Sequence, residues 1–186
     1  LLMGVCRLVL NERLLSGADG AVSLADFLDP QELSALYERF VLAYFRRHHP
    51  HLRPGAPWVS GGIEDAPVFL PGLHTDIVLT GPERTLIIDT KCYGRILGSR
   101  YDKSILSPAN RNQIYSYVMH EASDPRQSGR EVAGMLLYAQ TAVDPPIRET
   151  WTETGHRFHV RTLDLDRDFT EIAAQLDDVA ALFAPT

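Results

Sequence analysis

The stretch 73–93, LHTDIVLTGPERTLIIDTKCY, constrains the fold of this chain more than any other. Two short apolar runs rich in β-branched residues, 77–79 and 86–88, flank the sequence Gly-Pro-Glu-Arg. Such runs on either side of a Gly-Pro turn signal predict the two strands of an antiparallel hairpin. Pro82 suits the second position of a tight turn, because its ring fixes φ near the value required there.

The open end of this predicted hairpin gathers three charged side chains. A turn centred between Pro82 and Glu83 pairs Asp76 with Asp89, and directly opposed residues project to one face with Cβ atoms roughly 4.5–5.5 Å apart. Side-chain alternation returns Lys91 to the same face as Asp89. The register depends on the turn, since a slip of one residue sends a strand's side chains to the other face.

Two carboxylates placed opposite each other destabilise a sheet unless something compensates their charge. Mg²⁺ can do so, because it prefers oxygen ligands and is commonly held by one or two carboxylates together with substrate phosphate. In the alternative interpretation, Asp76 begins a strand, Asp89 ends one, and Lys91 forms an ordinary ion pair. The triplet by itself does not decide between the two.

Length and charge limit the other possibilities. The 186 residues are enough for one domain with a substantial core. A net charge of −6 argues against a domain that grips nucleic acid by charge alone. No apolar run approaches a membrane span and no secretory signal is evident. Cys6 and Cys92 have no metal-ligand spacing, so we expect reduced thiols in a cytoplasmic protein. The chain lacks an initiator Met, and we expect a fragment of a longer protein.

The N-terminal third predicts two helices. Residues 1–15 form the first, and 1–28 together are an N-terminal helix and linker ahead of a domain spanning 29–186. Asp29 as N-cap, Pro30 at the first position and Glu32 in a capping box open the second helix. Its apolar stripe runs to residue 45 at helical spacing. Glu38 lies at the border of that stripe, where exposure to solvent is the commoner outcome.

Two clusters of polar residues follow. The histidines at 48, 49 and 51 end the second helix, and their spacing favours an exposed helix end over a metal site. A first strand before the hairpin is predicted at residues 58–59 and Ile63.

The second polar cluster lies in the segment 94–106, which is predicted as a loop carrying Arg95, Arg100 and Lys103. This basic loop can contact phosphate as a flap, although a solvated loop explains it equally well.

The C-terminal half alternates helix and strand. Ser107 and Pro108 open a helix in which Gln113 and Tyr117, four residues apart, share one face. Buried or paired strands are predicted at 132–138, 150–154 and 158–163, and a last helix is capped by Asp168 with Glu171 in its capping box. The order of elements predicts an α/β protein in which helices flank a mixed central sheet.

An acidic residue on an early helix, an Asp, a hairpin, Asp-x-Lys and then a helix with Gln-x-x-x-Tyr together resemble the PD-(D/E)xK nuclease superfamily. More narrowly, the chain resembles the nuclease domain of the McrC family, the cleavage subunits of McrBC modification-dependent restriction systems. The resemblance covers most of residues 30–185 through the segments LSALYERFVLAYFRR, LPGLHTDIVL, LIIDTKCYG, NRNQIYSYV and GMLLYAQ. It implies a restriction-endonuclease-like core within the α/β class.

The resemblance also implies roles for individual residues. Asp76 and Asp89 match the metal-binding carboxylates, with the Thr90 carbonyl as a further ligand, and Lys91 matches the catalytic lysine. The supporting positions are the helix-borne acid and the Gln-x-x-x-Tyr pair, which correspond to Glu38, Gln113 and Tyr117. Thr75 stands where the superfamily motif has Pro. Cys92 stands where McrC relatives have an aromatic residue, and alternation points it away from the site, which favours packing over a nucleophilic role.

The implied activity is Mg²⁺-dependent hydrolysis of DNA phosphodiesters, with Mn²⁺ as a substitute, in the cytoplasm of a prokaryote. The implied partners are DNA and an McrB-like AAA+ GTPase, whose docking region on McrC lies outside this chain. The chain has no P-loop of its own. Two alternatives remain open: a stand-alone or RecB-like nuclease that needs only metal, and a catalytically idle domain that binds DNA or serves as a scaffold.

Overall fold

A computed structural model describes residues 30–59, 69, 72–92, 97–100, 103–140 and 145–184. The helix predicted at 1–15, its linker and Ile63 lie outside these residues. In the described part, no helix combines the length and the apolar character that crossing a bilayer requires.

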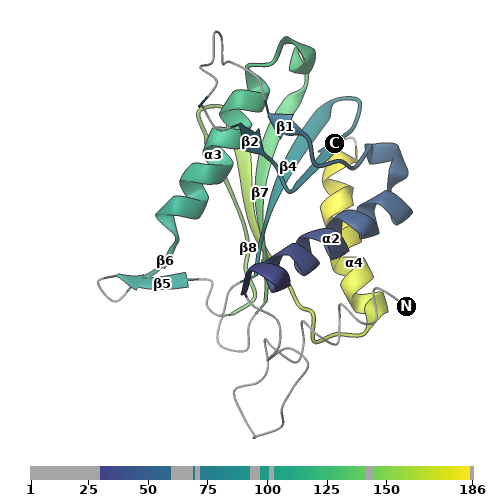
Figure 1. The fold of residues 1–186 in the computed structure, drawn as a ribbon, viewed down its shortest axis with the longest axis vertical. Coiled ribbons are helices and arrows are strands. Elements are labelled where there is room, and N and C mark those ends of the chain that lie inside the picture. Colours follow the sequence, from purple (N-terminus) through teal and green to yellow (C-terminus); the bar gives the residue numbers. More distant parts are fainter. Residues whose placement is uncertain are drawn as a thin grey trace, which may run out of the picture.

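The centre of the molecule is a five-stranded mixed sheet with strand order β3-β4-β7-β9-β8. The middle strands β4, β7 and β9 run parallel, and the edge strands β3 and β8 are antiparallel to their neighbours. Helices α2 and α4 lie over one face and α3 lies over the other (Figure 1). The predicted α/β class with a mixed sheet between helices is therefore confirmed.

The bounds of the sheet strands are Ile77–Thr80 (β3), Arg84–Lys91 (β4), Glu131–Ala139 (β7), Arg148–Glu153 (β8) and His156–Leu163 (β9). The helices span Pro30–His48 (α2), Pro108–Ala122 (α3) and Phe169–Ala180 (α4). Short 3₁₀ turns follow or connect them at Pro50–Leu52 (η2), Pro125–Gln127 (η3) and Ala181–Phe183 (η4).

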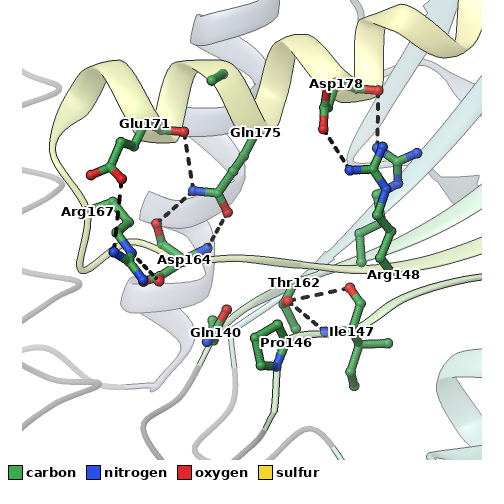
Figure 2. A pocket seen from close by; sticks show the side chains of 12 residues that line it. Gln140, Pro146, Ile147, Arg148, Thr162, Asp164, Arg167, Glu171, Gln175 and Asp178 are labelled. Atoms are coloured by element: carbon green, nitrogen blue, oxygen red, sulfur yellow. Dashed lines mark hydrogen bonds and ion pairs between the residues drawn. The ribbon is translucent and has the colours of Figure 1, made fainter.

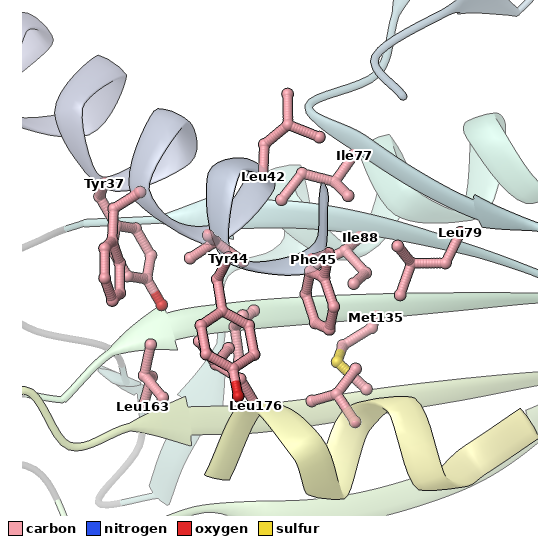
Figure 3. Packing of buried hydrophobic residues seen from close by; sticks show 14 of the residues in the cluster. Tyr37, Leu42, Tyr44, Phe45, Ile77, Leu79, Ile88, Met135, Leu163 and Leu176 are labelled. Atoms are coloured by element: carbon pink, nitrogen blue, oxygen red, sulfur yellow. The ribbon is translucent and has the colours of Figure 1, made fainter. Parts of the chain in front are cut away.

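The core has one layer on each face of the sheet. Towards α2 and α4, Ile77 and Ile88 meet Tyr37 and Phe45 of α2 and Leu176 of α4 (Figure 3). Towards α3, alternate residues of the same strands form the second layer. Because the central strands are buried on both faces, their sequences read as continuous apolar runs rather than as an alternating pattern.

Most predicted element boundaries are confirmed. Helix α2 begins at Pro30 and ends at His48, ahead of Pro50. Helix α3 begins at Pro108 after Ser107. The backbone N–H of Glu171 donates to Asp168 Oδ1 over 3.0 Å, which is the predicted cap of α4.

At the end of α2, His48 and His51 are exposed as expected, whereas His49 is not. His49 Nε2 lies 2.7 Å from Asp177 Oδ1, and its side chain is only 16% exposed. The hydroxyl of Tyr44 donates to the same carboxylate oxygen over 2.7 Å. His49 thus ties α2 to α4, a contact between residues distant in sequence that no local pattern indicates.

The segment predicted as a basic loop instead contains a two-stranded ribbon. Strands β5 (Leu97–Arg100) and β6 (Lys103–Leu106) pair antiparallel, with Arg100 opposite Lys103. Glycine and serine within this segment read as turn signals, and short strands outside a larger sheet have weak sequence patterns. Arg95 and the side chains of Arg100 and Lys103 lie outside what the structure describes.

A second small ribbon extends the outer edge of β3. Strand β1 (Trp58–Val59) pairs antiparallel with β2 (Leu73–His74), next to an isolated bridge between Gly55 and Val78. The predicted strand at 58–59 is confirmed. The ribbon leads directly into Asp76 and therefore lies at the open end of the hairpin.

Candidate active site

The hairpin has the predicted register. Ile77 pairs with Ile88 and Thr80 with Thr85, and the turn is closed by a 2.8 Å hydrogen bond from Gly81 N to Arg84 O. Asp76, one residue before the first pair, therefore stands opposite Asp89. The turn has two central residues because Pro82 and Glu83 alone separate the residues that close it.

Both carboxylates line one cavity of about 440 Å³. Its walls are the first turns of α2, the hairpin residues Asp76 and 89–92, and Gln113 of α3. The carboxyl end of β4 thus meets both helical layers here, so residues from three separate segments of the chain converge on one concave site.

Asp76 is held from across the hairpin. Its Oδ2 accepts a 2.7 Å hydrogen bond from Thr90 N and a 2.8 Å hydrogen bond from Thr90 Oγ1. The bend at Asp76 interrupts β-strand geometry, and the two bonds from Thr90 hold the carboxylate in place at that bend. Both bonds end on Oδ2, so Thr90 donates no hydrogen bond to Oδ1 of Asp76.

Asp89 is the most unusual group of the site. Only 1% of it is exposed, and neither of its oxygens accepts a well-formed hydrogen bond from a described residue. Its Oδ2 lies 2.7 Å from Lys91 Nζ, an ion pair by distance. Burial raises the pKa of Asp89 to about 6, Lys91 opposes that rise, and Asp76 adds to it. A buried carboxylate with so few hydrogen bonds is costly unless a cation complements it.

Lys91 connects the strand to α3. Its Nζ donates to Gln113 Oε1 over 2.9 Å, and Gln113 Nε2 donates to the hydroxyl of Tyr117 over 2.9 Å. The predicted shared face of Gln113 and Tyr117 is therefore observed, and it points at Lys91. Burial is the main cause that raises the pKa of Tyr117. The phenol is accordingly neutral and able to accept the bond from Gln113 at neutral pH.

Next to the series Lys91–Gln113–Tyr117 lies a buried hydrogen-bonded pair that the sequence did not indicate. Asn110 Nδ2 donates to the hydroxyl of Tyr138 over 2.8 Å. Tyr138 is the strand neighbour of Lys91 on β7, so the pair fixes the start of α3 against the strand beside the lysine. Asn110 precedes Gln113 by three residues and Tyr117 by seven, and this helical spacing is the signal that could have found it.

Glu38 is half-buried and lines the cavity, which is the less common of the two outcomes that its place at the border of the apolar stripe allows. Burial raises the pKa of Glu38, and Asp76 raises it further, whereas His74 and Arg39 lower it. Periodicity placed Glu38 correctly at the border of the apolar stripe. It could not show that the hairpin brings two further carboxylates to that border.

Cys92 is 6% exposed and packs within the core layer on the α2 side. This burial agrees with the expected packing role, but Cys92 also contributes to the lining of the cavity, so the expectation that it lies away from the site is not met.

The oxygen ligands of the site suit a hard cation such as Mg²⁺ or Mn²⁺. In the described part of the chain, no group of three or more His, Cys, Asp and Glu side chains is arranged to hold a metal, so protein side chains alone would not complete its coordination. Two carboxylates, with the remaining positions left to water and substrate oxygen, are the usual protein contribution to Mg²⁺. Asp76 and Asp89 form such a pair, and the hydrogen-bond deficit of Asp89 is the observation that fits a cation.

A second cavity, of about 510 Å³, lies between α4 and the opposite edge of the sheet. Figure 2 shows its arginines paired with acids: Arg148 with Asp178 over 2.7 Å and Arg167 with Asp164 over 2.8 Å. Arg161 donates to the backbone carbonyl of Asp178. Because carboxylates already compensate these arginines, the cavity is not a ready site for an anion, and we assign it no function.

Comparison with known proteins points to one system. Over 182 residues, 95% of this chain is 25% identical to a type IV methyl-directed restriction enzyme, EcoKMcrBC of Escherichia coli strain K12. The chain spans about half, 51%, of the length of that relative. No family model matches the chain. The likeness confirms the predicted resemblance to McrBC restriction enzymes.

Proposed function

We propose that this chain is the nuclease domain of an McrBC-like restriction complex and hydrolyses phosphodiester bonds of DNA with Mg²⁺. The observation that carries the proposal is the buried, hydrogen-bond-poor carboxylate of Asp89, close to Asp76 and Lys91 in one cavity. The likeness to a type IV restriction enzyme favours this activity over others that two carboxylates can serve. A restriction-endonuclease-like topology is part of the proposal.

Asp76, Asp89 and the carbonyl of Thr90 would hold the cation. When bound, Mg²⁺ supplies Lewis-acid polarisation of the scissile phosphate and a more acidic water, and Mn²⁺ can replace it. Thr90 orients Asp76 through its two hydrogen bonds, and Asp89 contributes a buried carboxylate whose charge is shared at present with Lys91 alone among the described residues. Glu38 adds a third carboxylate to the lining of the cavity.

Lys91 would act on the attacking water and on the negative charge of the phosphate. Its ammonium lies between Asp89 Oδ2 and Gln113 Oε1. Once a cation shares the charge of Asp89, the ammonium is available to orient the attacking water or to stabilise the negative charge that builds on the phosphate. Gln113, fixed by Tyr117, keeps Nζ at the cavity during that change.

A negatively charged chain needs help to hold DNA. An McrB-like AAA+ GTPase would recognise methylated DNA and deliver it, and the basic residues that follow β4 in the sequence, Arg95, Arg100 and Lys103, would contact its phosphates. Cleavage by the chain alone, with metal and without GTP or partner, would instead indicate a stand-alone nuclease. A catalytically idle scaffold would cleave DNA neither alone nor together with the partner and GTP.

The test is cleavage of a methylated supercoiled plasmid by the complex reconstituted with its GTPase partner, GTP and Mg²⁺. We expect Asp89→Asn and Lys91→Ala each to lower the rate at least 100-fold while the circular dichroism spectrum stays that of the parent. Asp178→Asn is the matched control, because it removes a carboxylate at the opposite edge of the sheet. Parental cleavage by Lys91→Ala would remove the lysine from the mechanism, and parental cleavage by both variants would end the proposal.

A further inference from the structure

An exposed tryptophan stands on the β1–β2 ribbon, which leads into Asp76 of the candidate site. Trp58 is 64% exposed, and it is one of two large hydrophobic residues in the described part of the chain that reach such exposure. Exposing an indole to water forgoes the burial that usually stabilises it. Its neighbours show that the ring is nevertheless held in place.

Two contacts fix the ring. Trp58 pairs with His74 across the β1–β2 ribbon, and the two rings meet edge to face with centroids 5.0 Å apart at 72°. A Cβ atom added to Gly72 would lie 2.7 Å from Trp58 Cε3 and 2.9 Å from Cζ3. The six-membered ring therefore rests directly on the backbone of Gly72, and only glycine leaves room for it.

The direction of the ring follows from the packing of the ribbon. Leu73 packs into the core layer under α3, and its partner Val59 is buried. Alternation then turns His74 and Trp58 to the other face, the side of α2. His74 precedes Asp76 by two residues in the chain, and Asp76 lines the cavity together with Glu38. The indole thus lies on the ribbon that leads into the site.

We infer that Trp58, supported by Gly72 and His74, is a stacking platform for a nucleobase of the DNA strand being cut, at a nucleotide adjacent to the scissile phosphate. A rigid, half-open aromatic ring beside a phosphate-directed site suits a base face, because every base can stack on it regardless of sequence. The inference rests on the proposed function. It adds to that function an uncharged contact that a chain of net charge −6 can use to hold a DNA strand.

The experiment compares two oligonucleotides of equal charge. A fluorescein-labelled dT 12-mer and a 12-mer of abasic phosphodiester units are titrated with the chain in Ca²⁺, and dissociation constants are read from anisotropy. We expect Trp58→Ala to weaken dT binding by about tenfold and abasic binding by less than about twofold, as loss of one base–aromatic stack predicts. Trp58→Phe keeps most of the affinity. Trp151→Phe, which alters the other tryptophan at the far edge of the sheet, leaves both constants unchanged.

A second readout is independent of variant folding. In the Trp151→Phe background, Trp58 is the remaining tryptophan of the two in the chain, and dT binding quenches its fluorescence while abasic binding does not. Equal dT affinity of the parent and Trp58→Ala, with no quenching, overturns the platform but leaves cleavage through Asp89 and Lys91 intact. The same result together with weaker binding to a protein partner assigns Trp58 to that interface instead. Failure of the parent chain both to bind and to cut DNA overturns the platform and the proposed function together.

Discussion

Thr90 holds Asp76 across the hairpin by two hydrogen bonds to the same carboxylate oxygen, 2.7 Å from its backbone nitrogen and 2.8 Å from its hydroxyl. The residue between Asp89 and Lys91 thus serves the carboxylate of the opposite strand. In the proposed mechanism this contact sets the direction of one ligand, which is a function that outer-shell hydrogen bonds commonly perform in metal sites.

Thr90→Val removes the hydroxyl bond and keeps the shape of the side chain. We expect the apparent affinity for Mg²⁺ to fall by about tenfold, the low end of the usual effect of losing an outer-shell partner. Thr90→Ser retains the hydroxyl, so its apparent affinity for Mg²⁺ should equal that of the parent. The measurement is the Mg²⁺ dependence of cleavage by the reconstituted complex, and an unchanged half-saturation for the valine variant would separate Thr90 from the metal site.

Asp89 makes the stability of the metal-free protein depend on pH. Its pKa is raised from 3.8 to about 6, so between those values the unfolded chain ionises first. Stability should therefore fall as pH rises through this window, by about 3 kcal/mol for a shift of roughly two pKa units.

The comparison is urea unfolding of the parent and of Asp89→Asn at pH 4, 5, 6 and 7 in EDTA. The free energy of unfolding of the parent, relative to the variant, should decline with rising pH and level off above pH 6. Mg²⁺ at pH 7 should return stability to the parent and not to the variant. A difference that stays constant across the series would mean that Asp89 is not buried as described.

Gln113 holds the ammonium of Lys91, and Tyr117 holds Gln113. Gln113→Ala should lower the single-turnover cleavage rate by about 10- to 100-fold, because misplacing a catalytic group by about 1 Å has an effect of that size. Tyr117→Phe, which removes only the more distant bond, should have a smaller effect. Equal rates for the parent and Gln113→Ala under single-turnover conditions would show that Lys91 is positioned without the glutamine.

Gly134 lets α3 approach the sheet. A Cβ atom there would lie 2.8 Å from Ile114 Cγ1 and 2.8 Å from Val118 Cγ2. Gly134→Ala should destabilise the fold by about 1–3 kcal/mol through overpacking. It should also reduce cleavage, because α3 carries Gln113. Gly55→Ala is the control, since its nearest neighbour would be Pro57 Cδ at 3.8 Å. Equal thermal midpoints for the two variants would contradict the described contact between helix and sheet.

Local sequence patterns are sufficient to predict the hairpin and the helix boundaries. The register of Asp76 and Asp89 follows from a two-residue turn and from side-chain alternation, both of which depend on neighbouring residues only. The helix starts at Pro30 and Pro108 are likewise set by local capping chemistry. These features could therefore be predicted from the sequence.

Contacts between distant segments could not be predicted in the same way. The entry of Glu38 into the cavity depends on where α2 crosses the hairpin, and the Asn110–Tyr138 bond depends on the docking of α3 on β7. The sequence predicts a loop in place of the β5–β6 ribbon, because these short strands contain residues typical of turns. The platform of Trp58 needs Gly72 and His74 to be close in space, which their sequence separation does not reveal.

The proposed function requires Asp76 and Asp89 together to bind a divalent cation beside Lys91. The most direct measurement is the anomalous difference density of crystals soaked in Mn²⁺. We predict one peak in contact with an oxygen of each carboxylate, absent from crystals of Asp89→Asn. Anomalous density elsewhere in the molecule, or an empty site in which Lys91 Nζ remains bound to Asp89 at saturating Mn²⁺, would contradict the account.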